Sequence, residues 1–328
     1  MKGKYLYGVI NKFVTLSGIK KDKNHSLNFD GLTTVDYQSL AAVVAEKEVK
    51  DYHKLPKEET VRELIAHQQM IEKIMSETSI LPVKFGTFLK DGEEVTSVLE
   101  KGYFFLCNTL RKIEDKIELD LVCFWNEAKA AQMAYQESKK VRNLQGKITK
   151  KGEITSEDKI ALGKLVADYL SEKREKLRDQ ILKTLKKEAV ESCSHVLADV
   201  NMLLNQAFLV KKERQIAFDY ALNELDSKFA DLLKFRLVGP LPPYSFATVI
   251  VDVLDKEEVE KAKKVLKVDG KVSRGEIKKA YNKLASTLHP DHGGNPIEFE
   301  LITKSYKLLK EFAEHGQIGI HLYLWEER

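Results

Sequence analysis

The feature that most constrains this fold is a stretch of about sixty residues, 126–188, made almost entirely of helix-forming residues. It follows an alternating, strand-like segment, ELDLVCFW at 118–125. Its apolar positions form narrow stripes, and its other faces are heavily charged. Because so narrow an apolar face can bury little, we expect a helical hairpin that projects from its domain and turns in QGKITKKGEI at 145–154.

The segments that follow this hairpin indicate the fold of its domain. They predict strands at 190–196, 202–210 and 235–241, and a helix at 213–232. The order from residue 118 is therefore strand, long helix, strand, strand, helix, strand, which is the chain order of a ferredoxin-like domain. We expect such a domain over residues 117–254, with the extended helical arm at 126–188.

The first part of the chain predicts a separate α+β domain over residues 1–116. The spacing of its apolar residues changes between two and 3.6 residues along the chain. A spacing of two predicts strands at 4–10, within 32–49 on both sides of Gln38 and Ser39, and at 80–89. A spacing of 3.6 predicts helices at 60–78 and 95–110. Thr60 and Glu63 have the spacing of a capping box at the start of the first helix. The chain as a whole is expected to be α+β.

Composition excludes several classes of protein. Of the 328 residues, 43% are hydrophobic and 32% are charged, which indicates packed cores rather than disorder. The net charge is only +4, and no basic patch with interleaved aromatic residues predicts nucleic-acid binding. Three widely spaced cysteines, Cys107, Cys123 and Cys193, exclude a disulfide framework and short-spaced zinc motifs. Without a signal-peptide core or an apolar run of about 18 residues, we expect a soluble cytoplasmic protein with no membrane partner.

Residues 255–328 predict an all-helical unit followed by a strand-like tail. Ser273 with Glu276, and Asn295 with Glu298, mark the starts of two helices whose apolar stripes face each other. A preceding amphipathic helix at 256–267 would cross these two helices. The alternating QIGIHLYLWEER tail is expected to form a strand that rejoins a sheet or pairs with a neighbour.

The short HPDHGG segment, 289–294, becomes the exposed turn between the two packed helices. Pro290 stiffens this turn, while His289 and Asp291 offer polar contacts to a partner. A metal site of His289, Asp291 and His292 is a weaker interpretation, because no further ligand lies close in sequence. A catalytic His–Asp dyad is equally weak, since it has no identifiable nucleophile or oxyanion hole.

EIKKAYNKLASTLHPDHGGN, residues 276–295, resembles the core of a J domain, the module that recruits and activates Hsp70 chaperones. The resemblance extends over residues 256–315. It implies that His289, Pro290 and Asp291 form the essential Hsp70 contact. Three lysines on the outer face of the same helix would be auxiliary and would steer an acidic partner surface: Lys278, Lys279 and Lys283. A J-like hairpin without Hsp70 activity remains the alternative.

Three other stretches, LPVKFGT at 81–87, LLNQAFLVKKER at 203–214 and GPLPPYSF at 239–246, resemble the gas vesicle protein GvpF/GvpL family. The resemblance, which includes the opening YLYGV, covers residues 4–250. It implies two α+β domains, the second with a modified ferredoxin fold, contact with the vesicle shell protein and no enzymatic activity.

The prolines of GPLPPYSF predict a rigid, extended strand end that holds Tyr244 and Phe246 in fixed directions. These two aromatic residues are either part of a structural cap on the strand or a contact for the shell protein.

We therefore expect a non-enzymatic gas vesicle assembly factor, located in the cytoplasm and at the gas vesicle, that needs no cofactor. It would bind the shell protein and other accessory proteins and bring an Hsp70-type chaperone to them. The first alternative is a minor structural component of the vesicle shell whose J-like segment lacks chaperone activity. The second is a general co-chaperone unrelated to vesicles. An enzyme is least favoured, because no phosphate loop, metal cluster or nucleophile–base set stands out in the sequence.

Overall fold

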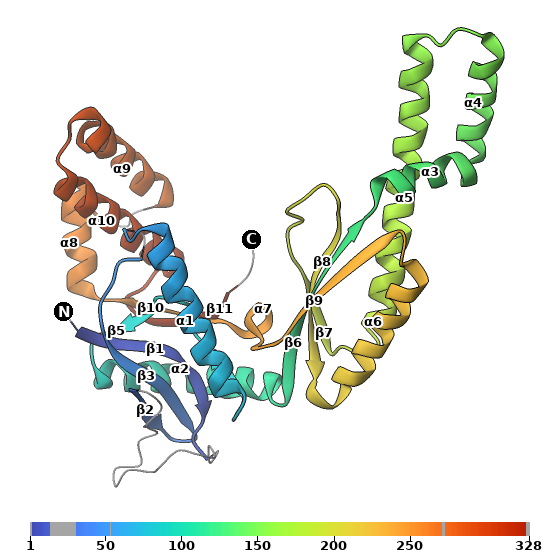
Figure 1. Ribbon diagram of the computed structural model, residues 1–328. Coiled ribbons are helices and arrows are strands. Elements are labelled where there is room, and N and C mark those ends of the chain that lie inside the picture. Colours follow the sequence, from blue (N-terminus) through green and yellow to red (C-terminus); the bar gives the residue numbers. More distant parts are fainter. Residues whose placement is uncertain (1, 14–30, 53, 271–272, 326–328) are drawn as a thin grey trace. The chain divides into compact units, whose positions relative to one another are not determined.

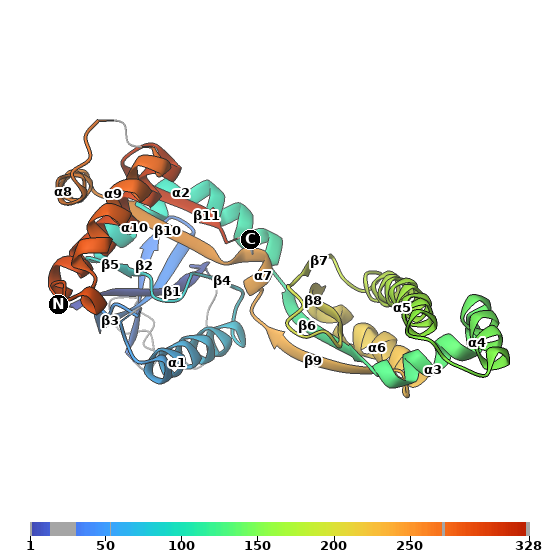
Figure 2. The ribbon, with the colours of Figure 1, turned by 90° about the horizontal axis from the view of Figure 1, so that it is seen from above.

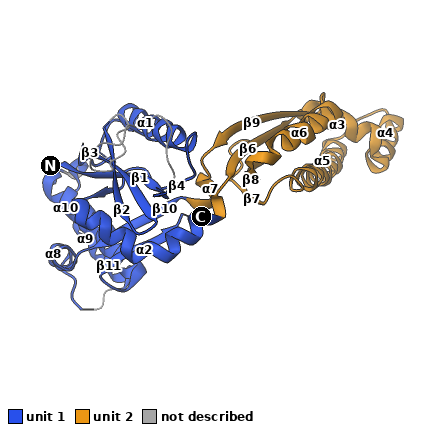
Figure 3. Cartoon of the chain, turned by 90° about the horizontal axis from the view of Figure 1, so that it is seen from below, with its two compact units in different colours: residues 1–111, 248–325 blue, residues 112–247, 326–328 orange. Residues whose placement is uncertain are grey.

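The computed structural model describes residues 2–13, 31–52, 54–270 and 273–325 (Figure 1). These residues form two compact units, one built from residues 1–111 and 248–325 and the other from residues 112–247 (Figure 3). Both units combine helices and strands, so the predicted α+β class is confirmed. The helical segment near the end of the chain belongs to the first unit. The division at residues 116 and 254 stays a prediction.

The first unit is built on an antiparallel sheet. Its strand order is β2 (Leu32–Tyr37), β3 (Leu40–Glu48), β1 (Lys2–Asn11) and β4 (Ile80–Pro82), with β5 (Phe88–Leu89) also paired to β1. Six consecutive residues of β1 are buried, which requires both faces of the sheet to be covered. Helices α1 (Lys57–Met75) and α2 (Gly92–Ile113) lie on opposite faces (Figure 2). The single strand expected at 80–89 is instead two short strands.

The capping box predicted for the first helix is wrong. Helix α1 begins at Lys57 after Pro56, so Thr60 lies inside its first turn. The Thr60 hydroxyl donates to the Tyr52 carbonyl oxygen at 3.2 Å. The Glu63 carboxylate accepts from the Lys50 ammonium at 2.6 Å instead of capping the helix.

The second unit has the predicted ferredoxin-like topology. Its strands are β6 (Lys116–Trp125), β7 (Glu191–Ser194), β8 (Met202–Lys211) and β9 (Leu233–Leu241), arranged antiparallel in the order β7-β8-β6-β9. A 3-10 turn, Lys212–Arg214, leads from β8 into α6 (Gln215–Phe229). Leu177 and Ile181 of α5 (Ser156–Leu185) and Phe218 of α6 pack in one core with the sheet. The same core includes Phe208 of β8, which is fully buried.

The helical arm consists of α3 (Glu127–Glu137), α4 (Lys139–Lys151) and the first part of α5 (Figure 1). Helix α5 has 30 residues, a length of roughly 45 Å. The hairpin is confirmed, but its turn is shorter than predicted. Gly146 continues α4, and the chain turns between Gly152, in a left-handed conformation, and Thr155, which caps α5 together with Asp158.

The last helices of the first unit lie between two paired strands. Helices α8 (Lys256–Leu266), α9 (Arg274–Leu288) and α10 (Pro296–His315) follow β10 (Val249–Leu254) and precede β11 (Gly319–Leu324). The two strands pair antiparallel from Val249↔Leu324 to Leu254↔Gly319. The expected tail strand therefore exists and pairs within its own chain.

Further contacts hold this helical unit against the rest of the first unit. The Asp252 carboxylate of β10 contacts His315 Nε2 at 2.9 Å and accepts from the Tyr323 hydroxyl at 2.8 Å. Leu322 of β11 packs so closely against Gly102 of α2 that a Cβ atom there would meet it. Lys54 and Glu300 form an ion pair. The helices are thus fixed at both ends of the insertion.

Cys107, Cys123 and Cys193 are not joined in disulfides, and Cys123 is buried. Within the described ranges, no helix combines the length and the apolar character needed to cross a membrane.

Candidate functional site: the His289–Asp291 turn

Helices α9 and α10 pack antiparallel and carry the turn between them. The aromatic contacts give the direction: Tyr281 stacks on Tyr306 with ring centroids 4.5 Å apart, and His289 meets Phe299 edge-on at 4.8 Å. The predicted inward stripe forms the core of this unit. Its buried members are Ile277 on α9 and Ile302 and Leu309 on α10, with Val259, Ala262 and Leu266 of α8.

The backbone of the turn is set by its own residues. Helix α9 ends at Leu288, and Pro290–His292 form one 3-10 turn. Gly293 has φ of 80°, in the left-handed region that favours glycine. Gly294 has no room for a side chain, because a Cβ atom would overlap the Leu288 backbone. The paired glycines therefore allow the chain to turn back sharply beside the end of α9.

His289 and Asp291 both present polar groups at the surface, as the sequence predicts. The His289 side chain is 40% exposed and that of Asp291 is 83% exposed. His289 Nδ1 accepts a hydrogen bond from the Asp291 amide at 3.2 Å, which orients the imidazole relative to the carboxylate. The Phe299 ring packs against the imidazole in a T-shaped contact. The turn is an outward-facing polar surface held by local packing.

The three lysines predicted to steer a partner are all exposed on α9. Lys279 and Lys283 are four residues apart and share one face of the helix, with Lys278 beside them. In the same helix Glu276 accepts from the Ser273 amide and hydroxyl in the predicted capping box. The acidic side chain at the start of α9 is therefore engaged locally, and the exposed lysines leave a positive face next to the turn.

Tyr244 and Phe246 belong to the second unit, whereas His289 belongs to the first. The extended conformation predicted for GPLPPYSF ends at Leu241, and the residues from Tyr244 form a one-turn helix, α7 (Tyr244–Ala247). Both aromatic side chains are half-buried. The extended segment gives way to a helix here because Pro243 suits the start of a helix, where its missing amide removes no hydrogen bond.

A buried polar cluster beneath α7 was not predicted. Glu118 of β6 is 1% exposed and accepts from the Ser245 amide at 2.8 Å and hydroxyl at 2.7 Å. His195 Nε2 lies 3.3 Å from the same hydroxyl. Burial, followed by the nearby Asp120 carboxylate, raises the pKa of Glu118 well above its usual range.

The arrangement of this cluster fits structural support better than catalysis. In a nucleophile–base–acid relay the imidazole lies between the hydroxyl and the carboxylate, whereas here the Ser245 hydroxyl lies between Glu118 and His195. The cluster therefore ties α7 to the sheet. Two carboxylates close together in the strand segment ELDLVCFW, Glu118 and Asp120, are the sequence signal that could have indicated it.

No group of three His, Cys, Asp or Glu side chains converges on a metal-binding geometry in the described part of the chain.

Comparisons with known proteins match both parts of the chain. Residues 3–248 match the family described as gas vesicle synthesis protein GvpL/GvpF, and residues 263–315 match the DnaJ domain. Gas vesicle protein F of Nostoc sp. is 27% identical over 258 residues, which cover 75% of this chain and 98% of that protein. Protein HLJ1 of Saccharomyces cerevisiae is 39% identical over 64 residues, 19% of this chain and 28% of that protein.

A solved structure shares the fold of the larger part. The crystal structure of GvpF from Anabaena sp. PCC7120 aligns with a TM-score of 0.62 and 22% identity, covering 76% of this chain and 99% of that one. The match to the family covers three quarters of the sequence and supports an accessory role in gas vesicles. This chain belongs to the gas vesicle GvpL/GvpF family and contains a DnaJ domain.

Proposed function

We propose that this protein is an assembly factor that binds the gas vesicle shell protein and recruits an Hsp70-type chaperone to it. The observation that carries the proposal is the union, in one chain, of a GvpL/GvpF region with a DnaJ domain whose His289–Asp291 turn is exposed. An apolar shell subunit is prone to aggregate before assembly, so a chaperone held beside it keeps it available.

The Hsp70 contact is assigned to the turn and the face beside it. His289 and Asp291 supply directional polar contacts, and Pro290 limits the conformational entropy lost when they are used. The exposed Lys278, Lys279 and Lys283 attract an acidic surface and raise the rate of encounter. Because α10 and β11 fix the helical unit at its second end, the turn is presented in a set orientation within its unit.

The shell-protein contact is assigned to the GvpL/GvpF region, with Tyr244 and Phe246 as candidate residues. Their half-buried rings in α7 leave part of each aromatic surface accessible. The Glu118–Ser245 hydrogen bonds hold this short helix in place, so the rings have fixed positions. Aromatic side chains with restricted motion are efficient contact residues in protein interfaces.

The Hsp70 half is tested by the rate of ATP hydrolysis of a purified Hsp70 with and without the full chain. His289→Gln should abolish stimulation and leave capture of co-expressed shell protein unchanged. Replacing Lys278, Lys279 and Lys283 with Gln should raise the concentration of this protein needed for half-maximal stimulation by roughly tenfold. The effect should be strongest at low salt. The matched control replaces three exposed lysines of α8, Lys256, Lys261 and Lys264. Unchanged stimulation by His289→Gln would refute recruitment through this turn.

The alternative, a minor structural component of the vesicle shell, gives a different result in fractionation. An assembly factor should leave vesicles on washing and appear in soluble complexes with shell subunit and chaperone. Stable retention on washed vesicles, together with no effect on Hsp70, would favour the structural component. Binding to many unrelated unfolded proteins would favour a general co-chaperone.

A further inference from the structure

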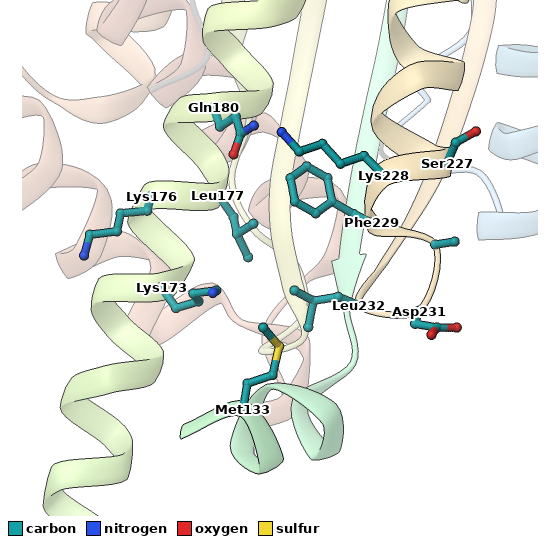
Figure 4. A pocket seen from close by; sticks show the side chains of 11 residues that line it. Met133, Lys173, Lys176, Leu177, Gln180, Ser227, Lys228, Phe229, Asp231 and Leu232 are labelled. Atoms are coloured by element: carbon teal, nitrogen blue, oxygen red, sulfur yellow. The ribbon is translucent and has the colours of Figure 1, made fainter. Parts of the chain in front are cut away.

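A groove in the second unit lies outside every feature used so far. It has a volume of about 510 Å³ and lies between α5 and the C-terminal end of α6, with α3 at one end (Figure 4). Four apolar side chains form its base: Met133, Leu177, Phe229 and Leu232. Leu177 and Leu232 are buried members of the domain core, whereas Met133 and Phe229 are only partly covered. At this point the apolar core of the unit reaches the surface.

The edge of the groove is basic. Lys173 and Lys176 come from α5 and Lys228 from α6, and Lys228 extends across toward Gln180 (Figure 4). The only carboxylate among the lining residues that the structure describes, Asp231, is paired with Lys129 at 2.7 Å. The groove therefore combines an apolar base with an excess of positive charge.

Two of the three lysines are only weakly engaged by the protein itself. The ammonium of Lys176 lies 3.9 Å from Glu172, and both side chains are more than 70% exposed, so this pair contributes little. The ammonium of Lys228 lies 5.2 Å from the centroid of the Phe229 ring. Lys173 is bound more firmly, by the Glu137 carboxylate at 2.9 Å. Lys176 and Lys228, on opposite walls, are thus the charges available to a ligand.

We propose that this groove binds an amphipathic helix of a partner protein, with acidic residues beside its apolar stripe. Apolar side chains of the helix would enter between Leu177 and Phe229, and its carboxylates would meet Lys176 and Lys228. A groove with an apolar base between two helices is a site in which the apolar face of a third helix can pack. The positive edge selects an acidic helix over a basic one. The inference is independent of Hsp70 recruitment, since it concerns the other unit.

The test uses a fluorescent, 18-residue helical peptide with leucines at i, i+3, i+4 and i+7 spacing and glutamates on both flanks. Fluorescence anisotropy with the full chain should show saturable binding that weakens as salt is raised. A peptide with lysines in place of the glutamates, and one with the same residues in scrambled order, should bind at least tenfold more weakly. Binding of the acidic peptide no tighter than either of these would overturn the proposal.

Variants locate the binding on the protein. The double variant Lys176→Glu, Lys228→Glu should weaken binding of the acidic peptide by roughly tenfold or more. It should improve binding of the lysine peptide. The control reverses two exposed lysines of the arm, Lys140 and Lys164, which lie outside the groove. All four side chains lie at the surface or edge, and equal thermal melts would show that folding is unaffected. Equal loss in both double variants would mean non-specific charge attraction and would also refute the groove.

Discussion

At the scale of single residues, two adjacent glycines determine whether the His289–Asp291 turn can form, and they do so for different reasons. Gly293 needs a positive φ but has open space around it. Gly294 has an ordinary φ but lies against the Leu288 backbone, and its amide donates to the His289 carbonyl oxygen at 3.0 Å. One position is limited by backbone conformation and the other by volume.

This difference predicts unequal effects of the same substitution. Gly293→Ala should cost about 1 kcal/mol, because alanine tolerates the left-handed region at that cost. Gly294→Ala should cost more than about 2 kcal/mol, because the turn must open to admit the methyl group. Hydrogen exchange of the α9 and α10 amides measures both. Hsp70 stimulation should survive the first change and be lost with the second, and equal effects would contradict this account of the turn.

The buried carboxylate of Glu118 gives a pH dependence. Its pKa is raised in the folded state by burial and by Asp120, so the folded chain holds this proton more tightly than the unfolded chain does. The stabilising contribution is complete below the ordinary carboxyl pKa of 4.5 and is lost as pH rises through the higher folded value. The free energy of unfolding of the second unit should therefore fall with pH above 4.5, by at most about 1.4 kcal/mol per pH unit.

The two tryptophans of the chain, Trp125 and Trp325, allow this to be measured, since they lie in different units. In a Trp325→Phe background, urea unfolding followed by Trp125 fluorescence reports the second unit. Glu118→Gln, which resembles the protonated acid, should flatten the pH profile. Glu191→Gln in the exposed edge strand β7 is the control and should leave the slope in place. A Glu118→Gln profile as steep as that of the original chain would rule out this carboxyl as the source.

At the scale of secondary structure elements, short-range signals predicted well where no tertiary contact competes with them. Ser273 and Glu276 form the expected capping box on an exposed helix start. Thr60 and Glu63 have the same spacing, but Lys50 engages Glu63 and Pro56 starts the helix one turn earlier. A sequence pattern alone cannot include Lys50, which lies on a preceding segment.

The helical arm illustrates a second limit. Two glycines bound QGKITKKGEI, and either could end a helix. Gly146 has helical neighbours on both sides and continues α4, whereas Gly152 precedes the Thr155–Asp158 cap that starts α5. The cap, not the first glycine, fixes the position of the turn. The existence of the hairpin was therefore predictable. The position of its turn depends on the Thr155–Asp158 cap, which follows the second glycine.

At the scale of the whole molecule, chain order predicted the ferredoxin-like unit, but strand pairing came only from the structure. The partner of β10 is β11, which follows three intervening helices, and nothing local to either strand specifies that pair. The same holds for the Glu118 cluster, whose members come from β6, the loop after β7 and α7. The candidate turn was predictable because its residues are contiguous. The groove was not, because its lining comes from three helices and from the segment that follows α6.

The pairing of β10 with β11 makes the J-domain helices an insertion within a hairpin. Leu254 and Gly319 are the last partners of that ladder, so their backbones are adjacent. We predict that residues 255–318 can be replaced by Asn-Gly, the sequence favoured in two-residue hairpin turns, without unfolding the rest of the first unit. The excised chain should bind shell protein as the full chain does and should not stimulate Hsp70.

A chain that ends at Leu254 is the informative comparison, because it lacks the same helices and also lacks β11. It loses the partner of β10 and the packing of Leu322 against Gly102. Its first unit should melt at least about 5 °C below that of the excised chain. Melting at the same temperature would show that β11 contributes no stability. Loss of shell-protein binding in the excised chain, despite intact folding, would instead place the shell-protein contact on the J-domain helices. Shell-protein binding and Hsp70 recruitment, which we have proposed to be separate, would then share one part of the chain.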